Sequence, residues 1–296
     1  MENLSLSSMK KSNDPGEMKT AAGLPIERMS VLEGVKSWRD LVLIVAFNDA
    51  AYLPSLIRET RAALPGADIL VVDDGSVDGS GKAAEKAGAM VIRHPFKMGM
   101  GRSLQSGYRF ALTHCCQRLV QMDSRGADSP QDAAALLDRL RQEDVQVAIG
   151  SRFLRTSGSQ STGLLERVAS SSASTATALL TGQRFSDPTS SLRAVSRKVF
   201  PLLCKEGFPH DCPDAGLLAL VGRAGYRVVE APIAASQRSS GTKSGLKWAL
   251  YPVRMLVSLL VLSASQPTKR PVHPAEMPAA FPAHATAPAF LERTLQ

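Results

Sequence analysis

The sequence predicts an α/β fold with a mainly parallel sheet flanked by helices. Between residues 41 and 153, apolar runs of strand length alternate with segments whose apolar residues recur at helical spacing. Such alternation indicates βαβ units, in which crossover helices join parallel strands. A second observation is the run VVDDGSVDGS, residues 71–80, where two adjacent carboxylates follow an apolar, β-branched segment. Because open α/β sheets bind ligands outside the carboxyl ends of their strands, this run predicts a binding site, although a solvated turn would use the same residue types.

The predicted elements follow one another without long gaps. The segment LVLIVAF has the continuous apolar character of a strand buried on both faces, and Pro65 and Gly66 end the helix that follows it. Gly88 closes the next helix in the same way. The predicted strands are 41–47, 68–74, 89–94, 119–123 and 145–153, and the predicted helices are 52–64, 82–87, 101–116, 131–141 and 164–180.

The chain divides into a folded domain, residues 39–245, and flanking segments. Residues 1–38 are polar with interrupting prolines, which predicts a flexible lead-in, and the Pro- and Ala-rich residues 266–296 predict a disordered tail. Residues 246–265 predict a C-terminal amphipathic helix whose apolar part is too short to span a bilayer. The sequence leaves open whether that helix lies on a membrane surface or docks on the protein's own core. It also leaves open whether the Ser/Thr/Gly-rich residues 156–163 form a loop beside the site or an idle connection.

Composition narrows the range of partners. A formal net charge of +8 over 296 residues favours acidic partners, namely phosphate groups, an anionic membrane face or nucleic acid. Aromatic residues make up only 5% and the sequence has no RNA-recognition motif, so we expect no nucleic-acid partner. The four cysteines form no CxxC pair, and the amino terminus lacks the apolar core of a signal peptide. These features predict a cytoplasmic protein, and its basic charge is compatible with peripheral contact at the inner face of the membrane.

Five runs occur in the order and rough spacing of one known family. They are VAFND at 45–49, VVDDGSVDGS at 71–80, MDSRGADSP at 122–130, GSRF at 150–153 and SDPTSSLRAVSR at 186–197. Together they resemble the inverting family 2 glycosyltransferases, most of all the dolichyl- or polyprenyl-phosphate sugar transferases such as dolichyl-phosphate mannose synthase. The resemblance implies the GT-A fold, whose Rossmann-like, mainly parallel sheet binds nucleotide-diphospho-sugars. Two further segments, residues 94–108 and 237–244, resemble the family's Gly-rich helix start and its basic Gly-Ser-Lys segment.

The resemblance also implies site residues. The nucleotide pocket would consist of five residues that follow the first two strands, namely Ala46, Phe47, Asp49 in place of a usual Glu, Asp73 and Asp74. An aspartate there can accept a hydrogen bond from a uracil or guanine N–H, which favours a UDP- or GDP-sugar as the donor. The phosphate oxygens of donor or acceptor would be bound by Arg152, Arg238 and Lys243. Each of these basic residues could instead be a solvated surface charge.

One departure from the family pattern concerns the metal ion. In the family, the two carboxylates of an Asp-Ala-Asp motif hold Mg²⁺ or Mn²⁺ on the donor diphosphate. In this sequence Asp123 stands at the first aspartate position and Arg125 stands at the second. A fixed cation supplies no oxygen ligand, so the sequence argues against a metal site of the family's type. Asp128 is one residue out of register but could partly replace the missing ligand, so Mg²⁺ or Mn²⁺ on Asp123 and Asp128 stays open. A guanidinium can neutralise the leaving diphosphate by bidentate hydrogen bonding, which would make Arg125 a substitute for the metal. The alternative is that loss of the metal ended catalysis.

These expectations define a function. The resemblance implies transfer of a sugar from a nucleotide diphosphate to a polyprenyl phosphate or related lipid, with inversion at the anomeric carbon. A phosphate acceptor is ionised at neutral pH and needs no base, whereas a hydroxyl acceptor would need one, for which Asp187 and Asp214 are the candidates. Both carboxylates could instead cap helices. Two alternatives stay open, namely a non-catalytic nucleotide-sugar-binding or scaffold relative and a transferase with a non-lipid acceptor.

Overall fold

A computed structural model of the chain describes residues 40–142, 144–154, 174, 175, 177–179, 181–210, 213–233 and 257. Several predictions lie outside the described residues. They concern residues 1–38, 156–163 and 266–296, Arg238, Lys243, and the helix expected at 246–265 apart from Val257. The described residues contain the predicted strands and most of the expected site.

The centre of the fold is a seven-stranded sheet with the order β3-β2-β1-β4-β6-β5-β7. Neighbouring strands run parallel except at β6, which is antiparallel to both β4 and β5. The mainly parallel sheet that the sequence predicts is therefore confirmed. The strand bounds are Asp40–Ala46 (β1), Asp68–Asp73 (β2), Met90–Arg93 (β3), Arg118–Asp123 (β4), Val147–Ser151 (β5), Arg193–Ser196 (β6) and Val228–Pro232 (β7).

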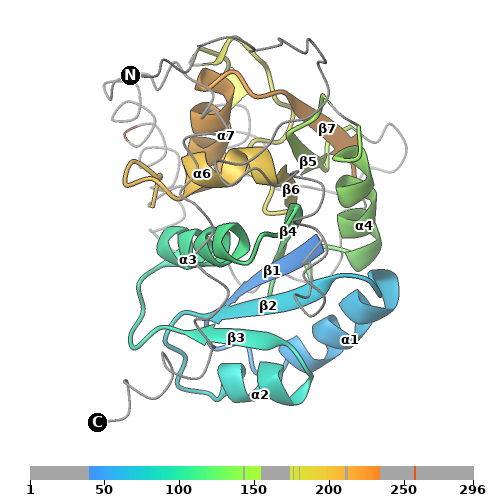
Figure 1. Cartoon of the computed structure of the whole chain (residues 1–296), viewed down its shortest axis with the longest axis vertical. Coiled ribbons are helices and arrows are strands. Elements are labelled where there is room, and N and C mark those ends of the chain that lie inside the picture. The colour runs from blue at the N-terminus through green and yellow to red at the C-terminus, as the bar shows by residue number, and fades with distance from the viewer. Residues whose placement is uncertain are drawn as a thin grey trace, which may run out of the picture. The chain divides into compact units, whose positions relative to one another are not determined.

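Helices cover both faces of the sheet (Figure 1). One face packs against α1, α2 and α4, and the other packs against α3, α6 and α7. The helix bounds are Leu53–Ala63 (α1), Ser80–Lys86 (α2), Met100–Thr113 (α3), Pro130–Arg139 (α4), Phe200–Leu203 (α6) and Pro213–Arg223 (α7), with a 3₁₀ turn η2 at Arg197–Val199. Among the described residues, no helix is long and apolar enough to cross a membrane.

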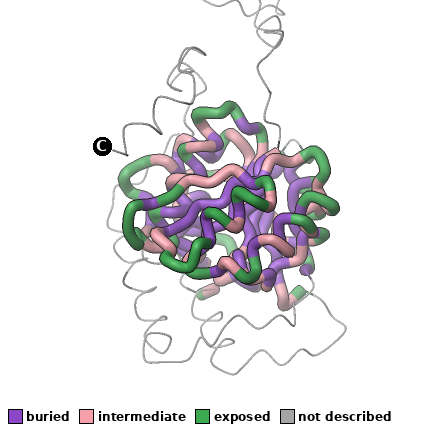
Figure 2. Tube along the Cα trace, turned by 90° about the horizontal axis from the view of Figure 1, so that it is seen from below, coloured by how far each residue is buried: buried purple, intermediate pink, exposed green. Residues whose placement is uncertain are grey.

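Two apolar cores, one on each face, explain why the strands are continuous apolar runs in the sequence. Leu41 and Leu43 of β1 belong to the core under α3, whereas Val42 and Ile44 belong to the core under α1. All four are fully buried, and burial of each such side chain stabilises the fold by about 2 kcal/mol. Figure 2 shows the buried strands in the interior and the exposed residues on the helices and loops around them. Alternate residues of a strand point to opposite faces, so a strand covered on both sides needs no polar positions.

The order of elements is confirmed through β5, with ends that differ from the predicted ones by a few residues. The predicted series lacks β6, α6, α7 and β7. In β6 the buried Arg193 interrupts the apolar pattern that marks a strand, and the first three residues of β7 are only half-buried. Of the helix predicted over 164–180, the described residues 174, 175 and 177–179 are helical.

Candidate functional site

The expected site residues gather where β1, β2 and β4 end, at the carboxyl edge of the sheet. These strands are neighbours, and the register pairs Ala46 of β1 with Asp73 of β2 and Val45 of β1 with Asp123 of β4. Residues far apart in the sequence therefore lie side by side at the edge where open α/β sheets bind their ligands. Arg152 follows β5, on the far side of the antiparallel β6.

Asp49 links the end of β1 to the turn after β4. Its side chain is 4% exposed, and Oδ2 accepts hydrogen bonds from the Phe47 amide at 3.1 Å and the Ser124 hydroxyl at 2.6 Å. Oδ1 accepts a hydrogen bond from Arg125 Nε at 2.9 Å. The Asp49 amide donates to Ser80 Oγ at 2.8 Å, where α2 begins. The carboxylate is thus fixed between three segments of the chain and contacts a guanidinium.

Arg125 supplies a fixed cation at this edge. Its amide donates to Asp123 Oδ2 at 2.9 Å, and its side chain is 40% exposed. Nε is bound by Asp49, whereas the terminal nitrogens Nη1 and Nη2 have no hydrogen-bond partner among the described residues. An arginine side chain stays charged over the physiological pH range. The turn after β4 therefore carries a charged guanidinium whose two terminal nitrogens can donate hydrogen bonds to a ligand.

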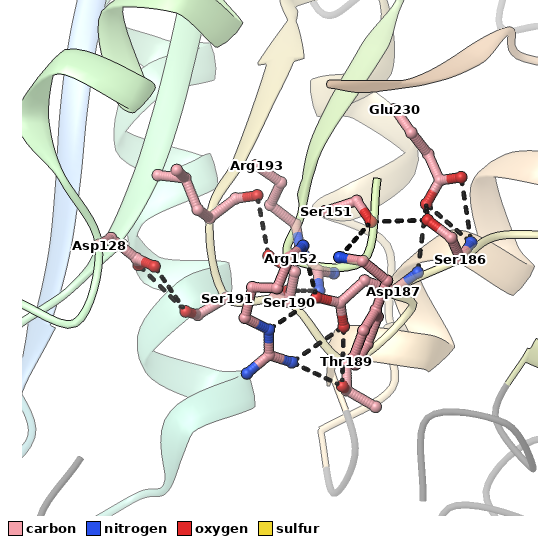
Figure 3. Close-up of polar contacts among 12 residues, drawn as sticks. Asp128, Ser151, Arg152, Ser186, Asp187, Thr189, Ser190, Ser191, Arg193 and Glu230 are labelled. Carbon is pink, nitrogen blue, oxygen red and sulfur yellow. Dashed lines mark hydrogen bonds and ion pairs between the residues drawn. The ribbon is translucent and has the colours of Figure 1, made fainter. Parts of the chain in front are cut away.

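Asp123 and Asp128 shape the same turn. Asp123 Oδ2 accepts hydrogen bonds from the amides of Arg125 at 2.9 Å and Ala127 at 3.4 Å. Asp128 Oδ2 accepts from the Asp123 amide at 2.8 Å and from the Ser191 hydroxyl at 3.0 Å (Figure 3). Burial raises the pKa of Asp128 to about 6, and the charge of Asp123 adds to this shift, although the hydrogen bonds oppose it. Asp128 is therefore a carboxyl group that can be neutral under mildly acidic conditions.

The donor set at this turn does not fit a divalent cation. Mg²⁺ and Mn²⁺ bind several hard oxygen ligands. Within the described ranges, no three His, Cys, Asp or Glu side chains are grouped so that they could hold a metal ion. Asp123 and Asp128 both accept hydrogen bonds from the protein. Arg125, which lies between them in the sequence, has a guanidinium group that supplies no oxygen ligand.

Asp74, after β2, organises the loop between β3 and α3. It is 3% exposed, and its carboxylate accepts hydrogen bonds from the Met98 amide at 2.8 Å and the Gly99 amide at 2.9 Å, with His94 Nδ1 at 3.1 Å. Burial acts to raise the pKa of Asp74, but these hydrogen bonds, together with one from Ser103, outweigh burial and lower the pKa below its usual value. Asp74 is therefore an anion at neutral pH.

Asp73 and Phe47 complete the group expected to bind the nucleotide. Asp73 is 1% exposed, its Oδ1 accepts a hydrogen bond from the Ser76 amide at 2.9 Å, and its Oδ2 lies 3.4 Å from Arg93 Nε. Lys97 Nζ lies 3.6 Å from the centre of the Phe47 ring, a cation–π contact. These side chains lie together at the ends of β1 and β2, and both aspartates there hold neighbouring loops.

On the other side of β6 from these residues, Arg152, which follows β5, forms an ion pair with Asp187 (Figure 3). Arg152 Nε donates to Asp187 Oδ2 at 2.7 Å and Nη2 donates to Oδ1 at 2.9 Å, which is bidentate geometry. The Asp187 side chain is 0% exposed and also accepts a hydrogen bond from the Thr189 hydroxyl at 3.1 Å. Glu230 of β7 accepts hydrogen bonds from the Ser186 amide at 2.8 Å and the Asp187 amide at 3.2 Å. Glu230 thus fixes the backbone that carries the anchor of Arg152.

Asp214 lies in the first turn of α7 and contacts Arg193 of β6. Arg193 is 1% exposed, and its Nη1 donates to the Asp214 carbonyl at 2.8 Å while Nη2 lies 3.1 Å from Asp214 Oδ1. Arg193 Nη2 also donates to the Ser190 carbonyl (Figure 3). The Asp214 side chain is 27% exposed and is therefore more accessible than that of Asp187. Asp214 lies inside α7 and Asp187 precedes no helix directly, so neither caps a helix.

Three residues that support the site were not predicted as site residues, namely Ser124, Ser191 and Glu230. Ser124 and Ser191 lie within the runs 122–130 and 186–197, whereas Glu230 lies outside all five runs. Ser124 and Ser191 bind carboxylates that are 75 and 63 residues away in the sequence, which no local pattern reveals. His94 is the first residue of the segment that resembles the family's Gly-rich helix start, so the sequence marked the segment. The sequence did not predict the contact between His94 and Asp74.

Comparison with known proteins shows what the chain is similar to in sequence. The family described as Glycosyl transferase family 2 matches residues 41–202. Polyprenol monophosphomannose synthase of Mycolicibacterium smegmatis is 29% identical over 251 residues, which cover 81% of this chain and 92% of that protein. Undecaprenyl-phosphate mannosyltransferase of Micrococcus luteus is 29% identical over 215 residues, which cover 69% of this chain and 86% of that protein.

Solved structures show the same fold. Glucosyl-3-phosphoglycerate synthase from Mycobacterium tuberculosis, in complex with Mn²⁺, UDP and phosphoglyceric acid, aligns with a TM-score of 0.58 at 18% identity over 77% of this chain and 79% of that one. This likeness confirms the predicted GT-A type of α/β fold. The family match runs from β1 into α6 and covers more than half of the chain. The chain therefore belongs to glycosyl transferase family 2.

Proposed function

We propose that this family 2 glycosyltransferase moves a sugar from a nucleotide diphosphate to the phosphate of a polyprenyl lipid, with inversion at the anomeric carbon. The observation that carries the proposal is the gathering, along one edge of the sheet, of the nucleotide-pocket residues and two guanidinium groups, Arg125 and Arg152. Each guanidinium is held by a buried carboxylate, which is an arrangement suited to phosphate groups. The acceptor is inferred from the two mannosyltransferases named for polyprenyl or undecaprenyl phosphate.

The reaction forms one bond and breaks one bond at the same carbon. An oxygen of the acceptor phosphate attacks the anomeric carbon from the face opposite the leaving group. The bond between that carbon and the donor diphosphate breaks, and its electron pair stays on the diphosphate oxygen. The acceptor oxygen is already ionised at neutral pH, so no proton has to be removed. The protein's task is to neutralise charge on both phosphate groups and to hold them in line.

Arg152 is the proposed binder of the acceptor phosphate. Its bidentate pair with the inaccessible Asp187 fixes the guanidinium, and 27% of the Arg152 side chain stays exposed. Asp187 would therefore act as the anchor of Arg152 rather than as a base, because both its oxygens are engaged. Asp214 is the accessible carboxylate and would be the base if the acceptor were a hydroxyl. Arg238 and Lys243 remain proposed phosphate binders on the residues that follow β7.

The donor nucleotide is proposed to bind at the ends of β1 and β2. The ring of Phe47 offers a surface for the base or ribose, and Asp73 and Asp74 are the acceptors for a uracil or guanine N–H. A carboxylate has about four lone-pair sites. Asp73 accepts a hydrogen bond from the Ser76 amide and lies beside Arg93, which leaves a site for a further hydrogen bond. Asp74 already contacts the Met98 and Gly99 amides, His94 and Ser103, so it would have to exchange one of these partners for the base. The family's metal site, with Mg²⁺ or Mn²⁺ on Asp123 and Asp128, does not match the side chains around Arg125, because the guanidinium supplies no oxygen ligand.

The proposed function is tested with the purified full chain, a panel of UDP- and GDP-sugars, and polyprenyl phosphate in detergent or liposomes. We expect a glycosyl-phosphate-lipid whose anomeric configuration is inverted, detected by mass spectrometry and NMR. Nucleotide-sugar binding without turnover would instead support the non-catalytic relative. Transfer only to a soluble acceptor would support the transferase with a non-lipid acceptor. Cosedimentation with liposomes, compared with a chain that ends before residue 246, tests the proposed peripheral membrane contact.

A Glu230→Gln variant tests the assignment of Arg152 to the acceptor. Gln keeps the size of Glu230 but weakens the hydrogen bonds from the Ser186 and Asp187 amides, because it lacks the negative charge. We expect KM for the lipid phosphate to rise about 5- to 10-fold. The Kd of the nucleoside diphosphate should stay unchanged, because Glu230 lies on β7, on the far side of β6 and β5 from the nucleotide residues. Equal losses in both would assign Glu230 a general structural role.

A further inference from the structure

We propose that the donor diphosphate is bound by the guanidinium of Arg125, with Asp49 as its positioning residue, and that this binding requires no divalent cation. The inference rests on the proposed function for one point, namely that the ligand is a nucleoside diphosphate. Two complexes of the structural neighbour contain Mn²⁺ or Mg²⁺ together with UDP, and a further complex is described with UDP alone.

The first support is the way in which Arg125 is held. Asp49 Oδ1 binds its Nε at 2.9 Å, and this contact fixes the plane of the guanidinium from one side. Nη1 and Nη2 have no hydrogen-bond partner in the described part of the chain, and 40% of the side chain is exposed. A planar group with two unused nitrogens matches the spacing of phosphate oxygens. The arrangement therefore has the geometry of a phosphate-binding group that is oriented before the ligand arrives.

The second support is that Asp49 itself cannot turn. Its Oδ2 accepts from the Phe47 amide and the Ser124 hydroxyl, and its amide is bound by Ser80 Oγ. Rotation of the carboxylate toward a nucleotide base would break the contacts that join β1 to the turn after β4. The family resemblance places Asp49 in the nucleotide pocket. These contacts assign it instead to Arg125, so its effect on the donor acts through the guanidinium.

The third support is the distribution of charge around the end of β1. Lys97 Nζ lies 3.6 Å from the centre of the Phe47 ring, and the amide of Phe47 is bound by Asp49. A second cation therefore lies close to the same strand end as Arg125. Asp49 offsets part of the charge of Arg125, whereas Lys97 forms no ion pair within the described part of the chain. The two cations together can offset part of the negative charge of a diphosphate, which is the electrostatic part of a divalent ion's task. A metal ion at the same place would be repelled by the guanidinium.

The direct test is calorimetric binding of UDP and of GDP to the full chain, in Mn²⁺ and separately in EDTA. We expect the Kd of the preferred nucleotide to agree within about twofold between the two conditions. Binding that is lost or weakened more than about tenfold in EDTA would overturn the inference and leave the proposed function intact. Absence of binding in both conditions would overturn the inference and count against the proposed function as well.

Two substitutions at Arg125 sharpen this test. Arg125→Lys keeps the charge but loses the planar fork, and we expect the nucleotide Kd to rise about 5-fold in EDTA. Arg125→Asp places a second carboxylate where the family has one. We expect this variant to lose binding by about 100-fold in EDTA and to recover part of it in Mn²⁺. Unchanged affinity of both variants in EDTA would remove Arg125 from the site.

The role of Asp49 is tested by a double-mutant cycle. Asp49→Asn should raise the nucleotide Kd about 10-fold, because the amide no longer orients the guanidinium. In the Arg125→Lys variant, Asp49→Asn should raise the nucleotide Kd about twofold or less, since the guanidinium that Asp49 positions is gone. Additive losses would show that Asp49 acts on the nucleotide by another route. Arg141→Gln is the matched control, because Arg141 lies in the turn after α4, is 66% exposed and, among the described residues, forms an ion pair with Asp138 alone.

Discussion

Two nearly inaccessible carboxylates at the same edge of the sheet differ in the direction of their pKa shifts. Asp74, after β2, has a lowered pKa, whereas Asp128, in the turn after β4, has a pKa raised to about 6. Their exposed fractions are 3% and 7%, so exposure alone does not explain the difference. Asp74 accepts hydrogen bonds from two backbone amides and contacts a histidine, while Asp128 accepts from one amide and one hydroxyl.

The comparison shows that depth of burial and hydrogen-bond donors together decide which carboxylates stay charged at this site, because burial is the largest cause of the raised pKa of Asp128 and hydrogen bonds outweigh burial at Asp74. Burial penalises both anions, and the penalty is overcome only where enough N–H groups point at the carboxylate. The end of β2 therefore has a permanent anion that holds a loop. The turn after β4 has a carboxyl group that can give up its charge close to Asp123. The cation that acts on Asp128 is Arg152, so a neutral Asp128 leaves the positive charge of Arg152 less opposed.

The largest expected effect comes from Asp74→Ala. The substitution leaves the amides of Met98 and Gly99 without their acceptor and frees the loop that leads into α3. We expect the free energy of unfolding to fall by about 4 kcal/mol. Denaturant unfolding measures this loss, and hydrogen exchange should show faster exchange of the amides of Met98 and Gly99.

Asp78→Ala is the matched control, because Asp78 is an exposed aspartate that also binds backbone amides, those of Ala50 and Ser80. We expect it to cost about 1 kcal/mol. If both variants lost the same amount, the burial and charge of Asp74 would not matter, and the comparison with Asp128 would lose its physical basis.

The next effect is a pH dependence that comes from Asp128. A carboxyl group with a raised pKa in the folded state binds its proton more tightly there than in the unfolded state. Its ionisation therefore destabilises the fold as pH rises from the unfolded value of 3.8 through the folded value of about 6. Relative to Asp128→Asn, we expect the free energy of unfolding of the wild type to fall by about 2 kcal/mol between pH 4 and pH 7. Asp74 acts in the other direction, since its contribution is lost only as pH falls below the ordinary value of 3.8.

Denaturant melts of wild type and Asp128→Asn at several pH values measure this difference. Asn can accept the hydrogen bond of the Asp123 amide and donate to Ser191, so it imitates the protonated acid. Two parallel pH profiles would mean that Asp128 has an ordinary pKa, and the contrast with Asp74 would disappear.

The sequence predicts the parts of this molecule that depend on local pattern. β1 was recognisable because both its faces are buried, and the acidic ends of β2 and β4 were recognisable by their position after apolar runs. β6 was not, because its four residues include the buried Arg193. The pair of Asp49 with Arg125 was also out of reach, since 76 residues separate the partners and only the adjacency of β1 and β4 brings them together.

The smallest effect that still tests the comparison is that of Ser191→Ala. The Ser191 hydroxyl is one of two donors to Asp128, and its loss removes a hydrogen bond that favours the charged form. We expect a cost of about 1 kcal/mol at pH 7, where Asp128 is ionised, and less than half of that at pH 5. Ser55 is half-buried and its hydroxyl donates to the Tyr52 carbonyl, an uncharged acceptor, so Ser55→Ala serves as the control. If Ser191→Ala lowers the free energy of unfolding by the same amount at every pH, the hydroxyl contributes through packing alone. If the loss grows with pH, the hydroxyl stabilises the charged form of Asp128.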